Sequence, residues 1–136
     1  MATITSTRPH MTVARALVES DGRVLVVRRA AWDTRPGMWE LPGGKVDRGE
    51  RVQRGLAREL EEETGLMLAG ARRVSCRELT SPRGRRIREH VYRVSAVGTV
   101  TLSDEHDAYA WVESPEGLEL TDSAEAALSL ASPGRP

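Results

Sequence analysis

The sequence predicts a single-domain α/β fold in which a central mixed β-sheet lies between helical layers. Three observations predict it: strand-like runs are interleaved with two helical segments, no Pro/Gly/Ser-rich linker divides the chain, and no internal repeat is found. At 136 residues the chain is long enough to bury a core without disulfides or a structural metal. We expect one domain over residues 11–131, a flexible arm over residues 1–10 and a tail over residues 132–136.

The amino-terminal part predicts a β-hairpin followed by a short strand. Residues 12–18 and 23–29 have strand character, and Asp21-Gly22 between them is a typical turn pair. The centre of the second strand is continuously apolar, which indicates that both of its faces are covered. A further strand over residues 38–41 ends at Pro42-Gly43-Gly44, where we expect a sharp break.

The remaining elements follow from capping and turn signals. Residues 51–64 predict a helix that Gly65 ends as its C-cap. A second helix begins at Thr121 or Asp122 and runs to about Leu130. Three strands lie between the helices, over residues 72–79, 86–97 and 109–113.

Composition excludes several classes of protein. The formal net charge is zero, so no overall field attracts nucleic acid or an anionic membrane, and we expect neither as a partner. No apolar run could span a bilayer and no secretion signal precedes the domain, which favours a cytoplasmic protein. Cys76 is the only cysteine, which excludes an internal disulfide; we interpret it as a small, partly buried strand residue.

The first helix carries acidic side chains in an unusual place. Its apolar stripe consists of Val52, Leu56 and Leu60. Glu63 falls inside this stripe, and Glu59 and Glu62 lie along its margin. Carboxylates this close raise one another's pKa, whereas a divalent cation would remove the repulsion. Oxygen ligands favour Mg²⁺, with Mn²⁺ as a possible substitute, although a solvated acidic face is the alternative for such a helix alone.

The residues around these glutamates have a specific spacing. After Gly44 come five residues, Glu50, seven residues, and then Arg58-Glu59-Leu60-Glu61-Glu62-Glu63-Thr64-Gly65-Leu66. This arrangement resembles the complete Nudix box, G-x5-E-x7-R-E-U-x-E-E-x-G-U with U aliphatic, and every defined position is filled. The preceding Trp39-Glu40-Leu41-Pro42-Gly43-Gly44-Lys45 and Arg28-Arg29 are similar to MutT-like members. The chain is thus identified as a member of the Nudix hydrolase superfamily, which implies an α/β/α sandwich.

The resemblance implies which residues bind metal and which are catalytic. The implied metal ligands are the Gly43 carbonyl, Glu59, Glu62 and Glu63, and a further carboxylate from a loop outside the box. Glu105, six residues before Trp111, resembles that further ligand; Asp104 and Asp107 replace it if the register differs, and an exposed acidic loop is the alternative.

The implied catalytic residues are Glu50, Arg58, Glu62 and Glu63. Arg58 orients the helix glutamates, and Glu50 acts in or beside the metal shell. Glu62 is the first choice as general base, while Glu63, Glu50 and Glu105 stay open as alternatives.

Substrate contacts are assigned to Arg29, Trp32 and Glu40. Arg29 is placed to reach a phosphate from the end of its strand, and Arg28 takes this role if the strand register differs. The alternative without a function is that the arginine lies on a solvated strand edge. Trp32 is the candidate for a base or sugar contact. We expect the other two tryptophans to lie in the core. Other polar residues keep a structural and a functional interpretation. Asp122 is an N-cap or a base contact, and the basic cluster is a solvated turn or, alternatively, a phosphate-steering patch or an RNA contact; its members are Arg83, Arg85, Arg86 and Arg88. His106 is at most a loop contact, and His90 is assigned no role.

The function implied is metal-dependent hydrolysis of a nucleoside diphosphate linkage. The compact, MutT-like length favours a nucleoside triphosphate, either standard or modified, that is cut to the monophosphate and pyrophosphate. A nucleotide sugar or another diphosphate conjugate is the alternative substrate. A non-hydrolytic nucleotide-sensing module is a further alternative, but such a module is expected to lose box glutamates and here none is lost. A homodimer is common in the family, so the resemblance also implies a second copy of the chain as a candidate partner.

Overall fold

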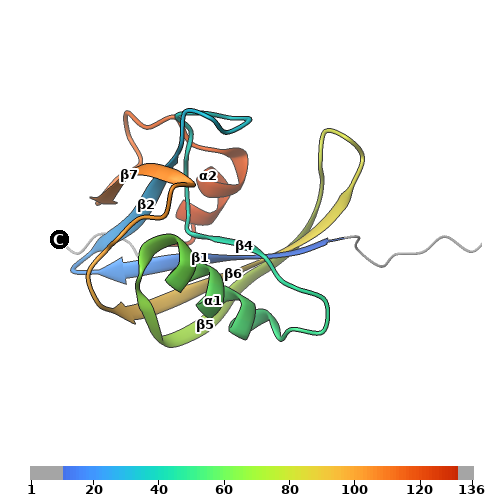
Figure 1. Cartoon of the computed structure of the whole chain (residues 1–136), viewed down its shortest axis with the longest axis horizontal. Coiled ribbons are helices and arrows are strands. Elements are labelled where there is room, and N and C mark those ends of the chain that lie inside the picture. The colour runs from blue at the N-terminus through green and yellow to red at the C-terminus, as the bar shows by residue number, and fades with distance from the viewer. Residues whose placement is uncertain (1–10, 132–136) are drawn as a thin grey trace, which may run out of the picture.

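The computed structural model describes residues 11–131, so the predicted arm and tail lie outside the described residues. Within them, seven strands form one mixed sheet, and one of the two helices lies on each side of it (Figure 1). The elements are β1 (Met11–Ser20), β2 (Arg23–Arg29), β3 (Trp39–Glu40), β4 (Gly43–Lys45), α1 (Val52–Thr64), β5 (Met67–Thr80), β6 (Arg86–Val97), β7 (His106–Val112) and α2 (Asp122–Leu128).

The strand β1 lies at the centre of the sheet, whose order is β3-β2-β1-β6-β5, with β4 paired to β1 and β7 paired to β2. It runs parallel to β6 from Met11 opposite Ile87 to Val18 opposite Val94. It pairs with β2 only at its last residues, where Ser20 lies opposite Arg23. The sheet therefore opens into two parts, β5-β6-β1-β4 and β3-β2-β7, which are joined at the β1–β2 hairpin.

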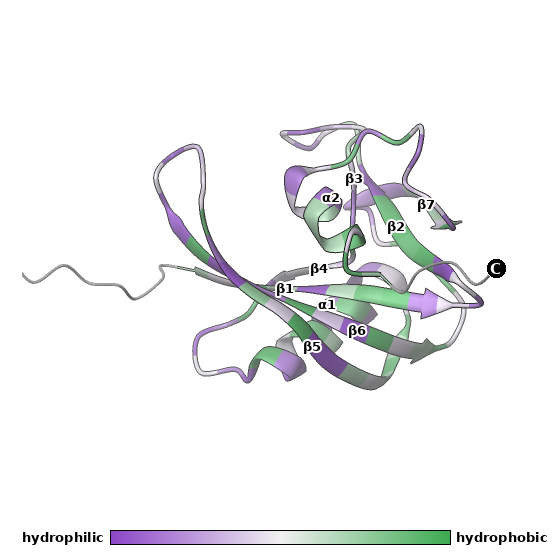
Figure 2. Ribbon diagram, turned by 180° about the vertical axis from the view of Figure 1, so that it is seen from behind, coloured by the Kyte–Doolittle hydropathy of each residue, from purple (hydrophilic) through white to green (hydrophobic). Residues whose placement is uncertain are grey.

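Successive side chains of β1 point to opposite faces of the sheet, and each face contributes to a separate hydrophobic cluster of the core. Ala14, Ala16 and Val18 point to the cluster that contains Leu56 and Leu60 of α1. Leu17 points the opposite way, to the cluster that contains Ala127 of α2. Figure 2 shows that the middle of β1 and of β2 is hydrophobic, whereas hydrophobic and hydrophilic residues alternate along β5. Each helix covers one face, as the predicted α/β/α arrangement requires.

The predicted amino-terminal hairpin is confirmed. Asp21 and Gly22 both have positive φ angles, 52° and 77°, as a two-residue turn of the primed type requires. The apolar residues from Val24 to Val27 are all buried, which agrees with a strand covered on both faces.

Three local expectations are wrong. The segment Gly43–Lys45 does not break the chain but forms β4, antiparallel to β1. Gly43 makes this possible: its φ is 141°, and a Cβ there would lie 2.0 Å from the carbonyl oxygen of Ala14. β5 begins at Met67, earlier than residue 72. Cys76 is exposed rather than partly buried, because β5 is the edge strand of the sheet.

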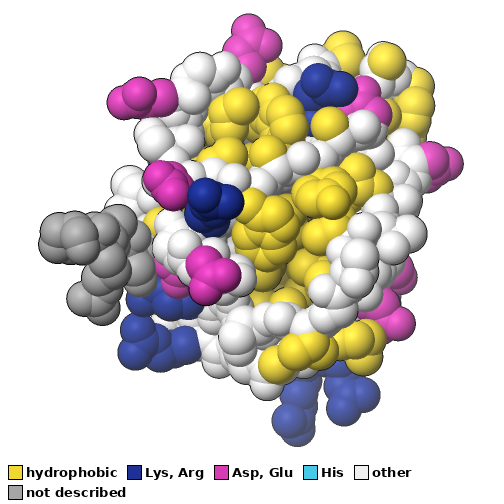
Figure 3. Space-filling view, turned by 90° about the vertical axis from the view of Figure 1, so that its left-hand side faces the viewer, with side chains coloured by type: hydrophobic (Ala, Val, Ile, Leu, Met, Phe, Trp, Pro, Cys, Tyr) yellow, Lys and Arg dark blue, Asp and Glu magenta, His cyan; other side chains and the backbone are white. Residues whose placement is uncertain are grey.

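Hydrophobic side chains are uncovered at one end of the molecule. Figure 3 views the end where β1 and β6 finish and shows hydrophobic side chains lining a hollow in the surface. Val97, the last residue of β6, is 59% exposed, and its strand partner Met67 is 52% exposed.

No helix among residues 11–131 has the length and apolar character needed to cross a membrane.

Candidate active site

Helix α1 presents the acidic side chains. It begins after Arg51, whose extended φ and ψ of −67° and 142° place it as the N-cap, although no side chain caps the helix there. It ends at Gly65, which has the left-handed φ of 73° and donates its N–H to the carbonyl of Glu61, as predicted. Leu56 and Leu60 are fully buried and hold one face of α1 against the sheet.

Glu63 is the buried carboxyl of this helix, with 4% of its surface exposed. Its Oε1 accepts a hydrogen bond of 3.1 Å from the backbone N–H of Gly43. Burial raises the pKa of Glu63 to about 9; the Gly43 N–H and Arg15 oppose this shift, while Glu59 and Glu105 add to it. A carboxyl in this position is costly to ionise unless a cation is added.

Glu59 lies one turn earlier and packs against the backbone of Gly44. A Cβ on Gly44 would lie 2.8 Å from Oε2 of Glu59, so a larger residue there would displace this carboxylate. The two neighbouring glycines of β4 thus have separate functions: Gly43 permits the approach to β1, and Gly44 permits the approach of Glu59.

Arg58 connects the carboxylates on the outer side of the helix. Its Nε and Nη2 donate to the two oxygens of Glu50 at 2.9 and 3.0 Å. Its Nη1 lies 3.1 Å from Glu59 and 3.3 Å from Glu62. The paired hydrogen bonds from Arg58 hold the pKa of Glu50 below its usual range. Arg58 therefore contacts three glutamates, two of them on the helix.

A cavity of about 300 Å³ lies between α1, β4 and the start of β7. Its lining residues are Arg15, Arg29, Trp32, Asp33, Glu40, Gly43, Gly44, Lys45, Glu59, Glu63, Glu105 and His106. The structure thus brings together Gly43, Glu59, Glu63 and Glu105 with the three expected substrate contacts.

Three of the expected catalytic residues do not line this cavity. Glu50 and Arg58 contact each other outside its lining, and the side chain of Glu62 is 58% exposed. Two residues that were alternatives to the expected ones also lie outside this cavity. Arg28 and Asp107 line a different depression, of about 520 Å³, that contains no residue of the box helix.

Glu40 is the centre of a buried polar network on the wall opposite α1. Its Oε1 accepts a 2.8 Å hydrogen bond from Arg29, and its Oε2 lies 2.8 Å from Nε2 of His106. Burial acts to raise the pKa of Glu40, but the hydrogen bond from His106 and the charges of Arg15 and Arg29 outweigh it, so the pKa is lowered. Arg29 also contacts Asp33 at 2.8 Å, so two carboxylates share its charge.

The sequence analysis missed several of these residues. His106 is not a loop contact: it is the first residue of β7, and its side chain is 3% exposed. Arg15 lies on the central strand and donates to the carbonyls of Leu41 and Gly43, each at 3.2 Å. A charged residue within an otherwise apolar strand was the available signal for Arg15. Lys45, the single lysine, lines the cavity and makes no ion pair among the described residues.

The remaining aromatic and polar residues of the sequence analysis lie either at the cavity or in structural positions elsewhere. Trp32 is 67% exposed, and its Nε1 donates to the carbonyl of Asp104 at 3.1 Å. Trp39 and Trp111 pack against the two core clusters, as expected. Thr121, rather than Asp122, caps α2 by accepting the Ala124 N–H. In the β5–β6 hairpin, Arg86 and Arg88 both contact Glu78, which supports the interpretation of a solvated turn.

Comparison with known proteins identifies the family. Residues 8–130 match the model of the NUDIX domain. The CTP pyrophosphohydrolase of Escherichia coli (strain K12) is 34% identical over 109 residues, which cover 79% of this chain and 78% of that protein. The nucleoside triphosphatase NudI of Salmonella newport (strain SL254) is 37% identical over 127 residues, which cover 82% and 86%.

A solved structure extends the similarity to three dimensions. The crystal structure of the MutT NUDIX hydrolase from Burkholderia pseudomallei matches with a TM-score of 0.79 at 30% identity, covering 92% of this chain and 99% of that one. Three observations point to the same family: the complete box, which includes most of α1, the matching fold, and relatives named as a pyrophosphohydrolase and a nucleoside triphosphatase. The chain belongs to the NUDIX family and is a Nudix hydrolase.

Proposed function

We propose that this enzyme hydrolyses a nucleoside triphosphate to the monophosphate and pyrophosphate with a divalent cation, Mg²⁺ or, in its place, Mn²⁺. One observation carries the proposal: Glu59 and Glu63 of α1 and Glu105 of the turn before β7 converge in one cavity. The opposite wall of that cavity supplies Arg29 and Trp32. A row of carboxylates faces groups suited to a phosphate and a base.

The residues present fit a hard divalent cation. The pKa of Glu63 is raised because burial and the nearby Glu59 and Glu105 disfavour its charge, and a cation bound among them would reverse that penalty. Glu59, Glu63 and Glu105 line the cavity and would hold the ion, with the carbonyl of Gly43 beside them. Glu62 does not line the cavity and would join them from the exposed edge of α1. When bound, Mg²⁺ neutralises phosphate oxygens and acidifies water.

The protein groups have separate tasks in the proposed reaction. Arg58 keeps Glu59 and Glu62 in fixed orientations through its Nη1 contacts. Glu62 is the proposed general base: its side chain is exposed to water, and it lies on the same edge of α1 as Glu59. Glu63, Glu50 and Glu105 are the alternatives if Glu62 proves dispensable.

Two cationic residues are suited to the substrate phosphates. Arg29 is already shared between Glu40 and Asp33, so it is positioned rigidly but is partly neutralised. Lys45 projects from β4 without an ion pair among the described residues and supplies a mobile positive charge. We assign the terminal phosphates to Lys45 and the phosphate nearest the nucleoside to Arg29.

The nucleoside triphosphate is favoured over other diphosphates by two observations. The relatives described above act, by their names, on CTP and on nucleoside triphosphates. Trp32 presents an exposed indole at the cavity while its Nε1 is anchored on the Asp104 carbonyl, so a base can stack on a ring whose orientation is fixed.

The decisive experiment measures phosphate and pyrophosphate release from nucleoside triphosphates, nucleotide sugars and dinucleoside polyphosphates, with Mg²⁺, with Mn²⁺ and with EDTA. Glu62→Gln and Glu63→Gln are expected to lose most activity and keep the fold. Glu61→Gln is the matched control, because Glu61 lies on the same helix, is exposed and does not line the cavity. Preference for nucleotide sugars would replace the substrate assignment, and activity within a few-fold of wild type in both variants would overturn the metal site.

A further inference from the structure

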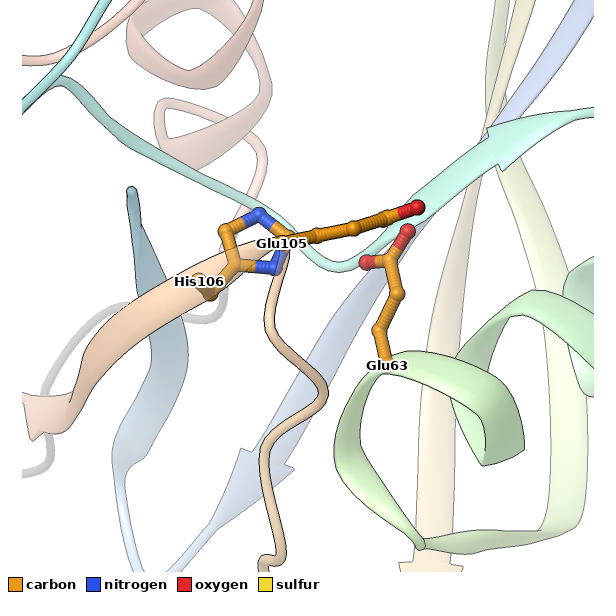
Figure 4. A group of neighbouring side chains, drawn as sticks. All are labelled: Glu63, Glu105 and His106. Atoms are coloured by element: carbon orange, nitrogen blue, oxygen red, sulfur yellow. The ribbon is translucent and has the colours of Figure 1, made fainter. Parts of the chain in front are cut away.

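A buried histidine adjoins the carboxylates of the candidate metal site. His106 directly follows Glu105, at the point where the turn ends and β7 begins. One ring nitrogen of His106, one carboxylate oxygen of Glu63 and one of Glu105 all lie within 4.8 Å of one another. Figure 4 shows Glu63 pointing from α1 toward Glu105, and the imidazole of His106 beside Glu105 with one ring nitrogen facing Glu63.

The hydrogen bond to Glu40 determines which nitrogen carries the proton. Nε2 of His106 lies 2.8 Å from Oε2 of Glu40, whose other oxygen accepts from Arg29. A carboxylate that already faces a guanidinium is an acceptor, so Nε2 is the donor in this pair. The neutral ring then has its lone pair on Nδ1.

That lone pair has no partner among the described residues. Nδ1 of His106 is buried and makes no hydrogen bond, and the whole side chain is only 3% exposed. Buried polar atoms are nearly always paired, so an orphaned acceptor beside two carboxylates indicates a missing positively charged partner. A histidine that binds a metal through one nitrogen typically donates its other N–H to a carboxylate, which is the arrangement of His106 and Glu40.

The spacing of the three groups suits a single ion. Donor atoms around a cation with bonds of about 2.1 Å are roughly 3 to 4 Å apart, so oxygens and nitrogen already within 4.8 Å need only small side-chain movements to converge. The groups also come from two separate segments, α1 and the turn that leads into β7, so an ion would join the two walls of the cavity.

Building on the proposed function, we infer that His106 is a nitrogen ligand, through Nδ1, of a metal position shared with Glu63 and Glu105, and that this position prefers Mn²⁺ to Mg²⁺. Mg²⁺ binds oxygen almost exclusively, whereas first-row transition ions accept imidazole readily. A purely structural His106, which only holds Glu40 in place, would make no such distinction between ions.

Pulsed electron paramagnetic resonance of protein with less than one equivalent of Mn²⁺ tests the inference, because a nitrogen bound to Mn²⁺ modulates the signal and ¹⁵N-histidine labelling identifies it. His106→Gln keeps an N–H donor near the position of Nε2 for Glu40 and has no group at Nδ1. His90→Gln is the control, because His90 is also buried with an unpaired Nδ1 but does not line the cavity.

We expect the nitrogen signal in wild type and in His90→Gln, and its loss in His106→Gln. The Kd for Mn²⁺ should rise at least about tenfold in His106→Gln, and the Kd for Mg²⁺ should rise less than about threefold. Equal losses for both ions would overturn the preference. Mn²⁺ bound in a Glu63-dependent way without a nitrogen signal would overturn the ligand assignment and leave the proposed function intact, whereas no Glu63-dependent binding would overturn both.

Discussion

The backbone N–H of Gly43 lies 3.1 Å from Oε1 of Glu63 and donates a hydrogen bond to it, although 20 residues separate the two. The contact joins the first residue of β4 to the last turn of α1. It depends on a backbone position that only glycine accepts, because φ is 141° and the Ala14 carbonyl lies where a Cβ would be. The geometry of the acidic helix is therefore determined partly by the strand beneath it.

Gly43→Ala is expected to destabilise the protein by about 3 kcal/mol or more, because the added methyl meets the backbone of β1 at an unfavourable φ. Urea unfolding measures the loss. Gly49→Ala is the matched control: Gly49 has a φ of 81° and open space around it, so only the backbone strain, roughly 1 kcal/mol, remains. Equal losses in both variants would contradict the close approach.

Glu63→Gln is expected to raise the Tm in EDTA at pH 7.5 by several degrees. The folded-state pKa of about 9 lies above the unfolded value, so this carboxyl makes the protein less stable as pH rises from about 4.5 to 9. Glutamine keeps the acceptor for Gly43 and removes the charge. Added Mg²⁺ should raise the Tm of wild type and of Glu61→Gln, and leave Glu63→Gln unchanged. A lower Tm for Glu63→Gln in EDTA would refute this account of its burial.

Arg58→Lys is expected to lower kcat/KM about 100-fold with little loss of stability. Lysine cannot make the paired contact with Glu50 while also reaching Glu59 and Glu62, so the glutamates lose their common orientation. The guanidinium is partly exposed, and its ion pairs add little to stability. Arg54→Lys on the same helix should leave both activity and Tm unchanged. Steady-state kinetics and thermal unfolding decide between a positioning function and a structural one.

Trp32→Ala is expected to raise KM for nucleoside triphosphates about tenfold and to change kcat little, because stacking of one base contributes roughly 1–3 kcal/mol. Trp32→Phe retains a ring but loses the Nε1 anchor on Asp104, and should have an intermediate KM. Hydrolysis of inorganic tripolyphosphate, which has no base, serves as the internal control. Equal effects on that compound would exclude stacking as the cause.

The pH dependence of stability should report His90. Burial lowers the pKa of His90, and the positive charges of Arg73 and Arg88 lower it further. The unfolded chain therefore takes up a proton near pH 6.5 that the folded chain does not, and stability falls as pH drops below that value. Chemical unfolding of His90→Gln between pH 5 and 7.5 should give a shallower slope than wild type. An unchanged slope would assign the effect to other groups.

The elements that the sequence predicted well are those with local signals. Helix α1 has an apolar stripe, a glycine C-cap and a glutamate inside the stripe, and all three features recur in the structure. Glu63 is accordingly buried where its position on the helix indicated. These features depend on residues within two or three turns of one another, so periodicity is enough to find them.

The features that were missed depend on residues far apart in the chain. The contact between Glu40 and His106 spans 66 residues, and neither has a local signal for it. The strand β4 exists only because β1 lies beside it, and the exposure of Cys76 follows from the place of β5 at the edge of the sheet. Pairing of distant strands is decided by tertiary packing rather than by propensity.

The parallel pairing of β1 with β6 has a consequence for how the enzyme is made. The ribosome releases α1, with all its glutamates, before β6 can complete the sheet that α1 covers. Pairing between such distant strands is slow to form, so the nascent helix has no finished surface to dock on. Glu105 and His106 emerge later still. A chain released before residue 105 would contain the whole box and most of the residues that line the cavity but neither Glu105 nor His106, so the carboxyl-terminal segment is needed to complete the cavity.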